Sequence, residues 1–315
     1  MKNYLTDVEG IKVGHFHDLD MGKGVSVIIC EDGATPGVDV RGSAPGTRET
    51  DLMQSEKLVD RVHAIVLSGG SAYGLDASSG VMRFLEENNI GFQTPFALVP
   101  VVSQAVIYDL NSLDPGKRPN GQMGYDAAKN ANIDQIQRGC VGAGLGATCS
   151  KTMGWDKAIK SGLGSNSVRH GDLVVSALVV VNALGDIYEA ETQLTGPYDR
   201  ETKTLFNSLD VLKSTNIGFT NTNTTIGVIA TNAKLTKPMA NKLAQIGHNA
   251  YAKAIRPVHT MSDGDTIFAL GTNKLECENF DLLLALAVET MEKAIVDAVK
   301  SANSMHGYLA YKDIK

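Results

Sequence analysis

Short runs of β-branched and other apolar residues recur along the chain and predict its strands. They occupy residues 25–30, 63–68, 173–181, 225–231 and 266–270, and most are bounded by Gly, Asp or Asn. Apolar runs of this length that end at turn-forming residues are typical of β-strands. We therefore predict a strand over each of these segments.

Three other segments are predicted to be helices. Residues 73–88 and 278–302 carry apolar side chains at near-helical spacing, which indicates one buried face on each. Residues 237–253 follow Thr236, which is suited to cap a helix, and contain Pro238 in the first turn. Strands and helices mix without a regular β-α-β alternation. This pattern favours an α+β fold or a layered sandwich over a doubly wound parallel sheet.

Composition and charge narrow the class of protein. The 315 residues are 43% hydrophobic and 20% charged, so the chain is expected to be a soluble globular protein with a large core. A formal net charge of −6 leaves no basic stripe, which argues against nucleic acid as a partner and favours a small molecule. The longest apolar stretch, residues 173–184, is too short for a membrane helix. Because Asp7 and Glu9 precede any apolar run, no secretory segment is predicted, and a cytoplasmic location is expected.

A glycine-rich stretch, GAGLGA at residues 142–147, has the G-x-G-x-x-A form of a dinucleotide-binding loop. The residues before it are not strand-like, and no acidic residue suited to a ribose follows at a distance of about 20 residues. A dinucleotide-binding oxidoreductase is therefore kept only as an alternative function.

A second glycine-rich stretch, SGGSAYG at residues 68–74, follows one predicted strand and precedes a predicted helix. It does not fit the G-x-S-x-G register of a nucleophile elbow, because Tyr73 occupies the position of the last Gly. We predict a tight strand-to-helix turn that lines a pocket. The G-K-[ST] signature of a phosphate-binding loop is absent from both stretches.

Seven histidines raise the question of a metal site. His15 and His17 would share one face of a strand, but no cluster of further ligands accompanies them. Surface or hydrogen-bonded histidines are the better interpretation, so we predict no metal and no other cofactor.

A polar run of alternating Thr and Asn leads directly into the predicted strand at 225–231, without Gly or Pro between them. Taken alone, such a run is typical of a loop. A different interpretation is that Thr224 lies at the mouth of the strand because its hydroxyl performs chemistry. A threonine hydroxyl is a poor nucleophile without a base, and an N-terminal threonine supplies that base from its own amine. Thr224 is internal, so this mechanism requires a chain break before it.

An acidic turn further along the chain could serve such an amine. In the stretch SDGDT, Asp263 and Asp265 are separated only by Gly264, so both carboxylates could face one ammonium group. For both carboxylates to turn toward one site, we expect Gly264 to adopt a backbone conformation that other residues avoid.

These stretches belong to an ordered set that covers nearly the whole chain and resembles the self-processing aminopeptidase family. That family includes the L-aminopeptidase/D-esterases, the β-aminopeptidases and the nylon-oligomer hydrolases. The matching motifs are LTDVEGIKVGH (5–15), SGGSAYGLDA (68–77), GAGLGATCSK (142–151), ALVVVNALGD (177–186), NTTIGVIATNAKLTK (223–237) and SDGDT (262–266).

The resemblance implies a four-layer αββα sandwich, the fold of N-terminal-nucleophile hydrolases, formed by a single catalytic domain over residues 1–315. It also implies a cut between Asn223 and Thr224 by the chain itself. The products would be an α chain, 1–223, and a β chain, 224–315, which stay associated. A homo-oligomer such as a tetramer is expected as well.

Individual residues are assigned by their match to the family motifs. Thr224 matches the nucleophile, with Thr225 as the rival one residue later. Asp263 and Asp265 match the acidic pair that orients the new amine, where the aminopeptidase branch has Ser and Glu. Asn182 matches an active-site Asn whose amide could donate to an oxyanion.

Two further residues, Lys151 and Tyr108, match a Lys and a Tyr that line the same pocket. The predicted function is hydrolysis of amide bonds in small peptides, amino-acid amides or esters, or oligoamides. An acyltransferase that uses the same Thr, and a catalytically silent oligomer that is never processed, remain open alternatives at this stage.

Overall fold

The computed structural model describes residues 1–214 and 223–314, and within them nine strands form one continuous sheet. Residues 219–222, which precede Asn223 and include most of the polar run, lie outside the described residues. Along the sheet the order is β10 (Leu163–His170), β11 (Leu173–Asn182), β16 (Thr224–Ala233), β18 (Thr266–Leu275), β2 (Lys23–Val40), β4 (Val62–Ser68), β7 (Val102–Val106) and β3 (Thr47–Arg48), with β1 (Lys12–Asp18) also paired to β2.

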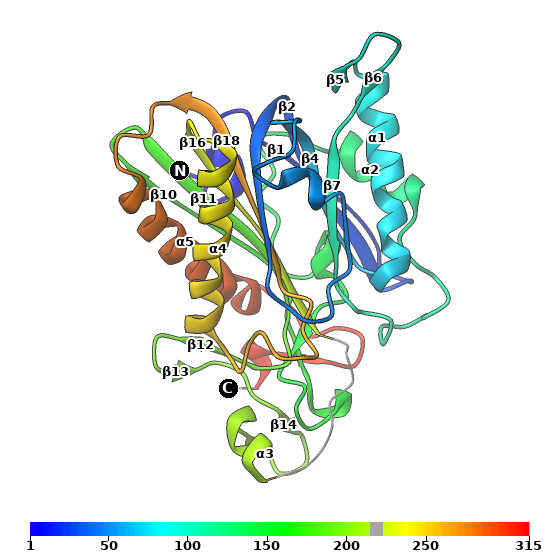
Figure 1. The fold of residues 1–315 in the computed structure, drawn as a ribbon. Coiled ribbons are helices and arrows are strands. Elements are labelled where there is room, and N and C mark those ends of the chain that lie inside the picture. The colour runs from blue at the N-terminus through cyan, green and yellow to red at the C-terminus, as the bar shows by residue number, and fades with distance from the viewer. Residues whose placement is uncertain (215–222, 315) are drawn as a thin grey trace.

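The long strand β2 divides this sheet into two halves (Figure 1). Its first part pairs with β1 and with β4, whereas its last part, Thr35–Val40, pairs with β18. One half therefore contains β1, β3, β4 and β7, and the other contains β10, β11, β16 and β18. Strands β16 and β18 are parallel to each other, and this pairing decides the geometry of the site described below.

Helices cover the outer face of each half. Helices α4 (Lys237–Ala254) and α5 (Phe280–Lys300) pack on the half that contains β10, β11 and β18. Helices α1 (Ala77–Glu87) and α2 (Gly121–Lys129) cover the half that contains β1, β4 and β7 (Figure 1). A short helix, α3 (Ser208–Ser214), lies away from both layers.

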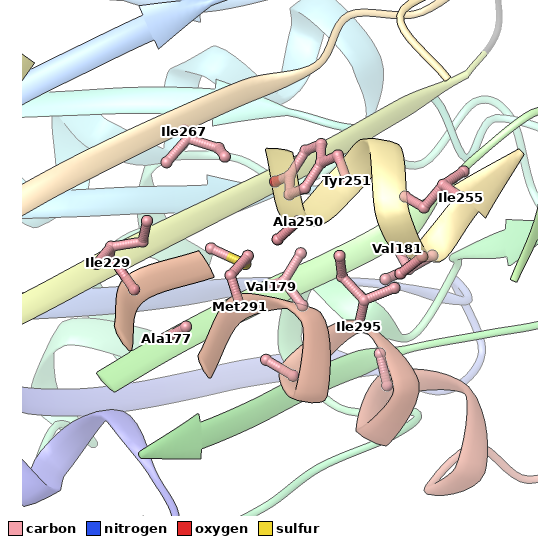
Figure 2. Close-up of a cluster of buried hydrophobic side chains, with 14 of the residues drawn as sticks. Ala177, Val179, Val181, Ile229, Ala250, Tyr251, Ile255, Ile267, Met291 and Ile295 are labelled. Atoms are coloured by element: carbon pink, nitrogen blue, oxygen red, sulfur yellow. The ribbon is translucent and has the colours of Figure 1, made fainter. Parts of the chain in front are cut away.

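Three hydrophobic clusters fill the three spaces between these four layers. On β11, Val175, Val179 and Val181 face α4 and α5, whereas Leu178 and Val180 face the other half of the sheet. Such alternation follows from the period of two residues in a strand. Figure 2 shows the outer cluster, in which Val179, Met291 and Ile295 pack together.

The inner and opposite clusters complete the sandwich. The inner cluster joins Ile65 and Leu67 of β4 to Phe268 of β18, and the opposite cluster joins Val27 of β2 to Val81 of α1. The layers run helix, sheet, sheet, helix, so the predicted αββα sandwich is confirmed.

A strand or helix is found at each predicted segment, although β2 continues to Val40, ten residues beyond the predicted end at residue 30. Thr236 caps α4 by accepting the Met239 N–H. Residues 73–88 are not one helix, because a 3-10 turn over Ser71–Asp76 precedes α1.

Several elements were missed by sequence reasoning, among them β7, β10, α2 and α3. Helix α2 contains two glycines and several small residues, and β10 (LGSNSVRH) has a polar pattern although β11 and α5 cover it. No helix of the described residues is long and apolar enough to cross a membrane.

Candidate active site

Thr224 is the first residue of β16, at the edge of the sheet where several strand ends meet. It pairs with Asn182, the last residue of the antiparallel strand β11. Parallel strands begin at the same edge of a sheet, so the start of β18 lies beside the start of β16. A bridge between Asn223 and Asp263 results, and it places the acidic turn against the predicted cleavage site.

The carbonyl oxygen of Asn223 accepts two hydrogen bonds. One comes from the Gly264 N–H at 2.9 Å and the other from the Thr224 hydroxyl at 2.5 Å. A backbone N–H aimed at a carbonyl oxygen is the arrangement that stabilises negative charge developing there. The proposed nucleophile thus lies against the peptide group that it would attack, and Gly264 N–H is placed to hold the oxyanion.

Gly264 is required for space rather than for an unusual backbone angle. Its φ is not in the left-handed region, so the expectation of a conformation that other residues avoid is wrong. A Cβ at this position would instead lie 2.8 Å from Thr224 Oγ1 and 2.7 Å from the Ala44 carbonyl oxygen. The acidic turn needs a glycine because Thr224 packs directly against it.

We expect Gly264→Ala to slow cleavage before Thr224 by on the order of a hundredfold, because the added methyl group must displace either the hydroxyl or the turn by about 1 Å. The appearance of the 224–315 fragment over time on a denaturing gel measures this effect. Gly116→Ala, in an exposed loop, is the control and should be processed at the wild-type rate. Wild-type cleavage of Gly264→Ala would show that this close contact does not matter for processing.

Both predicted acids are buried, and both carboxylates are held by local donors. Asp263 is 2% exposed and accepts the Thr260 N–H and hydroxyl, each at 2.7 Å. Asp265 is 1% exposed and accepts the Thr225 N–H at 2.7 Å through one oxygen. Its other oxygen accepts the ring Nδ1 of His259 at 2.8 Å. Burial, together with the charge of Asp265, raises the pKa of Asp263.

Asn182 connects the remaining predicted residues. Lys151 Nζ donates to both the backbone oxygen and Oδ1 of Asn182, each at 2.9 Å, while Asn182 Nδ2 donates to the backbone oxygen of Tyr108 at 2.9 Å. The amide predicted to serve an oxyanion is therefore also part of a fixed chain from Lys151 to Tyr108. Burial lowers the pKa of Lys151 to about 7, although nearby groups, including Asp263, oppose the shift.

A cavity of about 100 Å³ opens beside Thr224. Its walls come from β7, the turn at residues 44–46, the strand-to-helix turn and the predicted cleavage site, and none of its lining residues is charged. They are Ala44, Pro45, Gly46, Ser71, Ala72, Val106, Tyr108, Asn223 and Thr224. The prediction that SGGSAYG lines a pocket is confirmed. Tyr108 lines this cavity, whereas Lys151 lies behind Asn182 and is absent from the lining.

Sequence reasoning missed Asp109, which shapes this cavity. Its Oδ1 accepts the Gly70 N–H at 2.6 Å and so fixes the turn in which Gly70 and Ser71 both have positive φ. The carboxyl group is fully buried, and burial raises its pKa to about 6. Asp109 is far from Gly70 in the sequence and belongs to no recognisable motif, so no local signal identifies it.

The alternative dinucleotide site is not supported. Gly142–Gly144 form a 3-10 turn that packs on β1 and β2, and the Ala143 N–H donates to the Ser26 hydroxyl. This stretch is neither preceded by a strand nor followed by a helix in the way a dinucleotide-binding loop requires.

The histidines that suggested a metal pair have other partners. His15 is bonded through its ring nitrogens to the Tyr4 and Ser26 hydroxyls. Within the described residues, no group of three or more His, Cys, Asp or Glu side chains could hold a metal ion.

Solved structures share this fold over almost the whole chain. A β-aminopeptidase of Burkholderia sp. has a TM-score of 0.75 at 19% identity, covering 100% of this chain and 92% of the other. The L-aminopeptidase D-Ala-esterase/amidase of Ochrobactrum anthropi, described as a variant of the Ntn hydrolase fold, has a TM-score of 0.74 at 18% identity, covering 96% and 87%. The fold is therefore that of N-terminal-nucleophile hydrolases.

The family follows from the sequence comparisons. A family model described as "Peptidase family S58" matches residues 3–312, and the chain belongs to this family of peptidases, which are enzymes that hydrolyse amide bonds. An uncharacterized aminopeptidase of Mycobacterium leprae is 36% identical over 98% of this chain and 93% of its own length. A 6-aminohexanoate-oligomer endohydrolase of Agromyces sp. is 32% identical over 93% of this chain and 85% of its own length. The resemblance inferred from the motifs is confirmed at the level of the family.

Proposed function

We propose that the chain cleaves itself between Asn223 and Thr224 and then hydrolyses amide bonds with Thr224 as an N-terminal nucleophile. The observation that carries this proposal is the carbonyl of Asn223, which receives both the Thr224 hydroxyl and the Gly264 N–H. A hydroxyl and an oxyanion donor on one peptide group are the two parts that an acyl shift needs.

Processing would begin with attack of Thr224 Oγ1 on the carbonyl carbon of Asn223. The Gly264 N–H holds the oxyanion while the bond between Asn223 and the Thr224 nitrogen breaks and that nitrogen takes up a proton. The resulting ester is then hydrolysed by water, which leaves a carboxylate on Asn223 and a free amine on Thr224.

Turnover would use the same hydroxyl, with the new amine as general base. An α-amine has an ordinary pKa of about 7.7 to 8.0, close to what such a base requires. The hydroxyl attacks the substrate carbonyl, the amine passes its proton to the leaving nitrogen, and water releases the acyl group from Thr224. Asp263 and Asp265 would orient the amine, and Asn182, held by Lys151, would lie beside the nucleophile at the end of β11.

We infer a substrate whose acyl portion carries a small, uncharged side chain, in the class of peptides, amino-acid amides or esters, and oligoamides. The small volume and the uncharged walls of the cavity support this inference. Two relatives are named as an aminopeptidase and a 6-aminohexanoate-oligomer endohydrolase, and these names support amide substrates in general.

The two products of processing are expected to stay together in one catalytic domain. Strands β16 and β18, from residues 224–315, lie between β11 and β2, from residues 1–223, in the middle of the sheet. Separation would expose the hydrophobic clusters on both faces of these strands. We also propose a homo-oligomer, such as a tetramer, on the basis of the family resemblance.

Intact-mass measurement of the purified protein tests the proposal. We expect two chains, residues 1–223 and 224–315, that elute together under native conditions and separate only on denaturation. A fully active preparation that contains one intact chain would overturn the proposal. Cleavage at a neighbouring bond would instead assign the nucleophile to another residue.

A further inference from the structure

His259 holds the Asp265 carboxylate through two donors to one oxygen. The backbone N–H of His259 lies 3.2 Å from Asp265 Oδ2, and the ring Nδ1 lies 2.8 Å from the same atom. The other oxygen, Oδ1, accepts the Thr225 N–H at 2.7 Å. His259 thus holds Oδ2 of the carboxylate, while Oδ1 is bonded to the start of β16.

The backbone of His259 is in a conformation that few non-glycine residues adopt. Its φ is +55°, in the left-handed region, which is uncommon for residues other than Gly and in which Asn, Asp and His are found more often than other side chains. This conformation lets the N–H and the ring of the same residue reach one carboxylate oxygen. Such local strain persists only when the surroundings enforce it, and it is concentrated at functional sites.

The His259 ring is supported from behind by two aromatic side chains of α4. Its centroid is 4.8 Å from that of His248 and 6.1 Å from that of Tyr251. His248 in turn is bonded to the backbone oxygen of Asp39 at 3.1 Å, and burial lowers the pKa of His248 to about 3, so this ring is neutral. The neutral His248 ring and the Tyr251 ring therefore fix the orientation of His259.

We propose that His259 is a positioning residue of the active site, which orients the Asp265 carboxylate toward the start of β16 and, after cleavage, toward the amine of Thr224. This inference rests on the proposed function. Without His259, Asp265 Oδ2 loses both its ring donor and the geometry of the backbone donor, and the carboxylate is free to rotate. A displacement of about 1 Å in such a group costs on the order of a hundredfold in rate.

Two variants at this position separate hydrogen bonding from packing. His259→Asn keeps an N–H donor close to the position of Nδ1, and Asn tolerates positive φ. His259→Ala removes the donor and also replaces His at positive φ with Ala, which is less often found there. His306→Ala is the matched control for the second effect, because His306 has a φ of +53° in a loop that contributes no residue to the cavity.

The experiment measures the extent of cleavage, kcat and KM on a small amide substrate, and Tm for each purified protein. We expect kcat of His259→Ala to fall about a hundredfold at nearly unchanged KM, with a Tm close to that of His306→Ala. His259→Asn should recover most of kcat, and His306→Ala should have wild-type kinetics. If His259→Ala is not cleaved, recovery of cleavage in His259→Asn supports the same role.

Two results would overturn the inference. In one, His259→Ala retains wild-type kcat. In the other, His259→Asn is as impaired as His259→Ala, so that the hydrogen-bond donor is not what matters. The wild-type fragment pattern tests the proposed function separately, because active wild-type protein in one intact chain overturns self-processing, whereas cleaved and fully active His259 variants overturn only the inference about His259.

Discussion

Thr224→Ala is expected to yield a folded protein that remains one chain and hydrolyses no amide substrate above background. The substitution removes the hydroxyl that contacts the Asn223 carbonyl, and with it the only nucleophile that the proposed mechanism uses. Loss of a covalent nucleophile costs at least about a thousandfold in rate. Intact mass measures processing, and the release of product from an amide substrate measures turnover.

Thr225→Val is the matched control for this prediction. Thr225 Oγ1 is buried and has no hydrogen-bond partner in the described part of the chain, so its hydroxyl, unlike that of Thr224, makes no hydrogen bond to the Asn223 carbonyl. Valine has the same shape and keeps the N–H that donates to Asp265. We expect Thr225→Val to be cleaved and active. If the wild-type protein and Thr224→Ala are both cut between residues 224 and 225 while Thr225→Val is not, Thr225 is the processing nucleophile.

Thr224→Ser adds a graded test of the same step. Serine keeps a hydroxyl on the same carbon, so processing and turnover should both persist, with rates reduced by the additional rotational freedom of the side chain. A Thr224→Ser protein as inactive as Thr224→Ala would indicate that the methyl group, and not the hydroxyl alone, is essential.

The sequence predicts the layers of this fold better than it predicts the connections within the site. Runs such as 173–181 and 225–231 are identifiable as strands because β-branched residues fill both faces of buried strands. The polar strand β10 and the glycine-containing helix α2 were missed, because their burial comes from neighbours such as α5 that are distant in the sequence. Sequence patterns reveal local periodicity, whereas β10 and α2 are stabilised by tertiary contacts that such patterns do not contain.

Within the site, the same limit separates what was predicted from what was not. Thr224 and Asp263 come together because β16 and β18 are parallel, a pairing that no local pattern encodes but that the family resemblance anticipates. Lys151 is near the site but acts on Asn182 rather than on the cavity. Sequence reasoning does not distinguish His259 from the other histidines, because its hydrogen bond to Asp265 depends on a left-handed backbone conformation at His259.

Asp265→Asn is expected to reduce kcat/KM by about a hundredfold or more in protein that has already been cleaved. The Asp265 carboxylate only accepts hydrogen bonds, and here it receives donors from Thr225 and His259 at both oxygens. An asparagine must turn its own NH₂ group toward one of these donors. The resulting repulsion displaces the start of β16 or the side chain at position 265. A displacement of about 1 Å at a reacting group lowers the rate by on the order of a hundredfold.

The pH profile of Asp265→Asn should also shift, and its direction can be worked out. A nearby carboxylate favours the ammonium form of the Thr224 amine and raises its pKa, whereas burial lowers it. The variant removes the first effect and keeps the second, so the amine pKa falls and the free base persists to lower pH. The charge of Asp265 also helps to raise the pKa of Asp263, so Asp263 stays ionised to lower pH in the variant. The fall in the amine pKa moves the acid limb of the kcat/KM profile to lower pH by roughly one unit, and the Asp263 carboxylate that stays ionised opposes part of this shift.

Asp263→Asn is the companion variant, and the comparison between the two decides what the acidic pair does. Asp263 is held by Thr260 rather than by β16, so its loss removes charge from the site while the donors to Asp265 remain in place. We therefore expect Asp263→Asn to move the acid limb in the same direction, with a smaller fall in rate than Asp265→Asn. Wild-type rates and an unchanged pH profile in both variants would show that the acidic turn only leads the chain into β18 and takes no part in catalysis. The local support for Thr224 as the nucleophile would then rest on the Asn223 carbonyl and Gly264 alone.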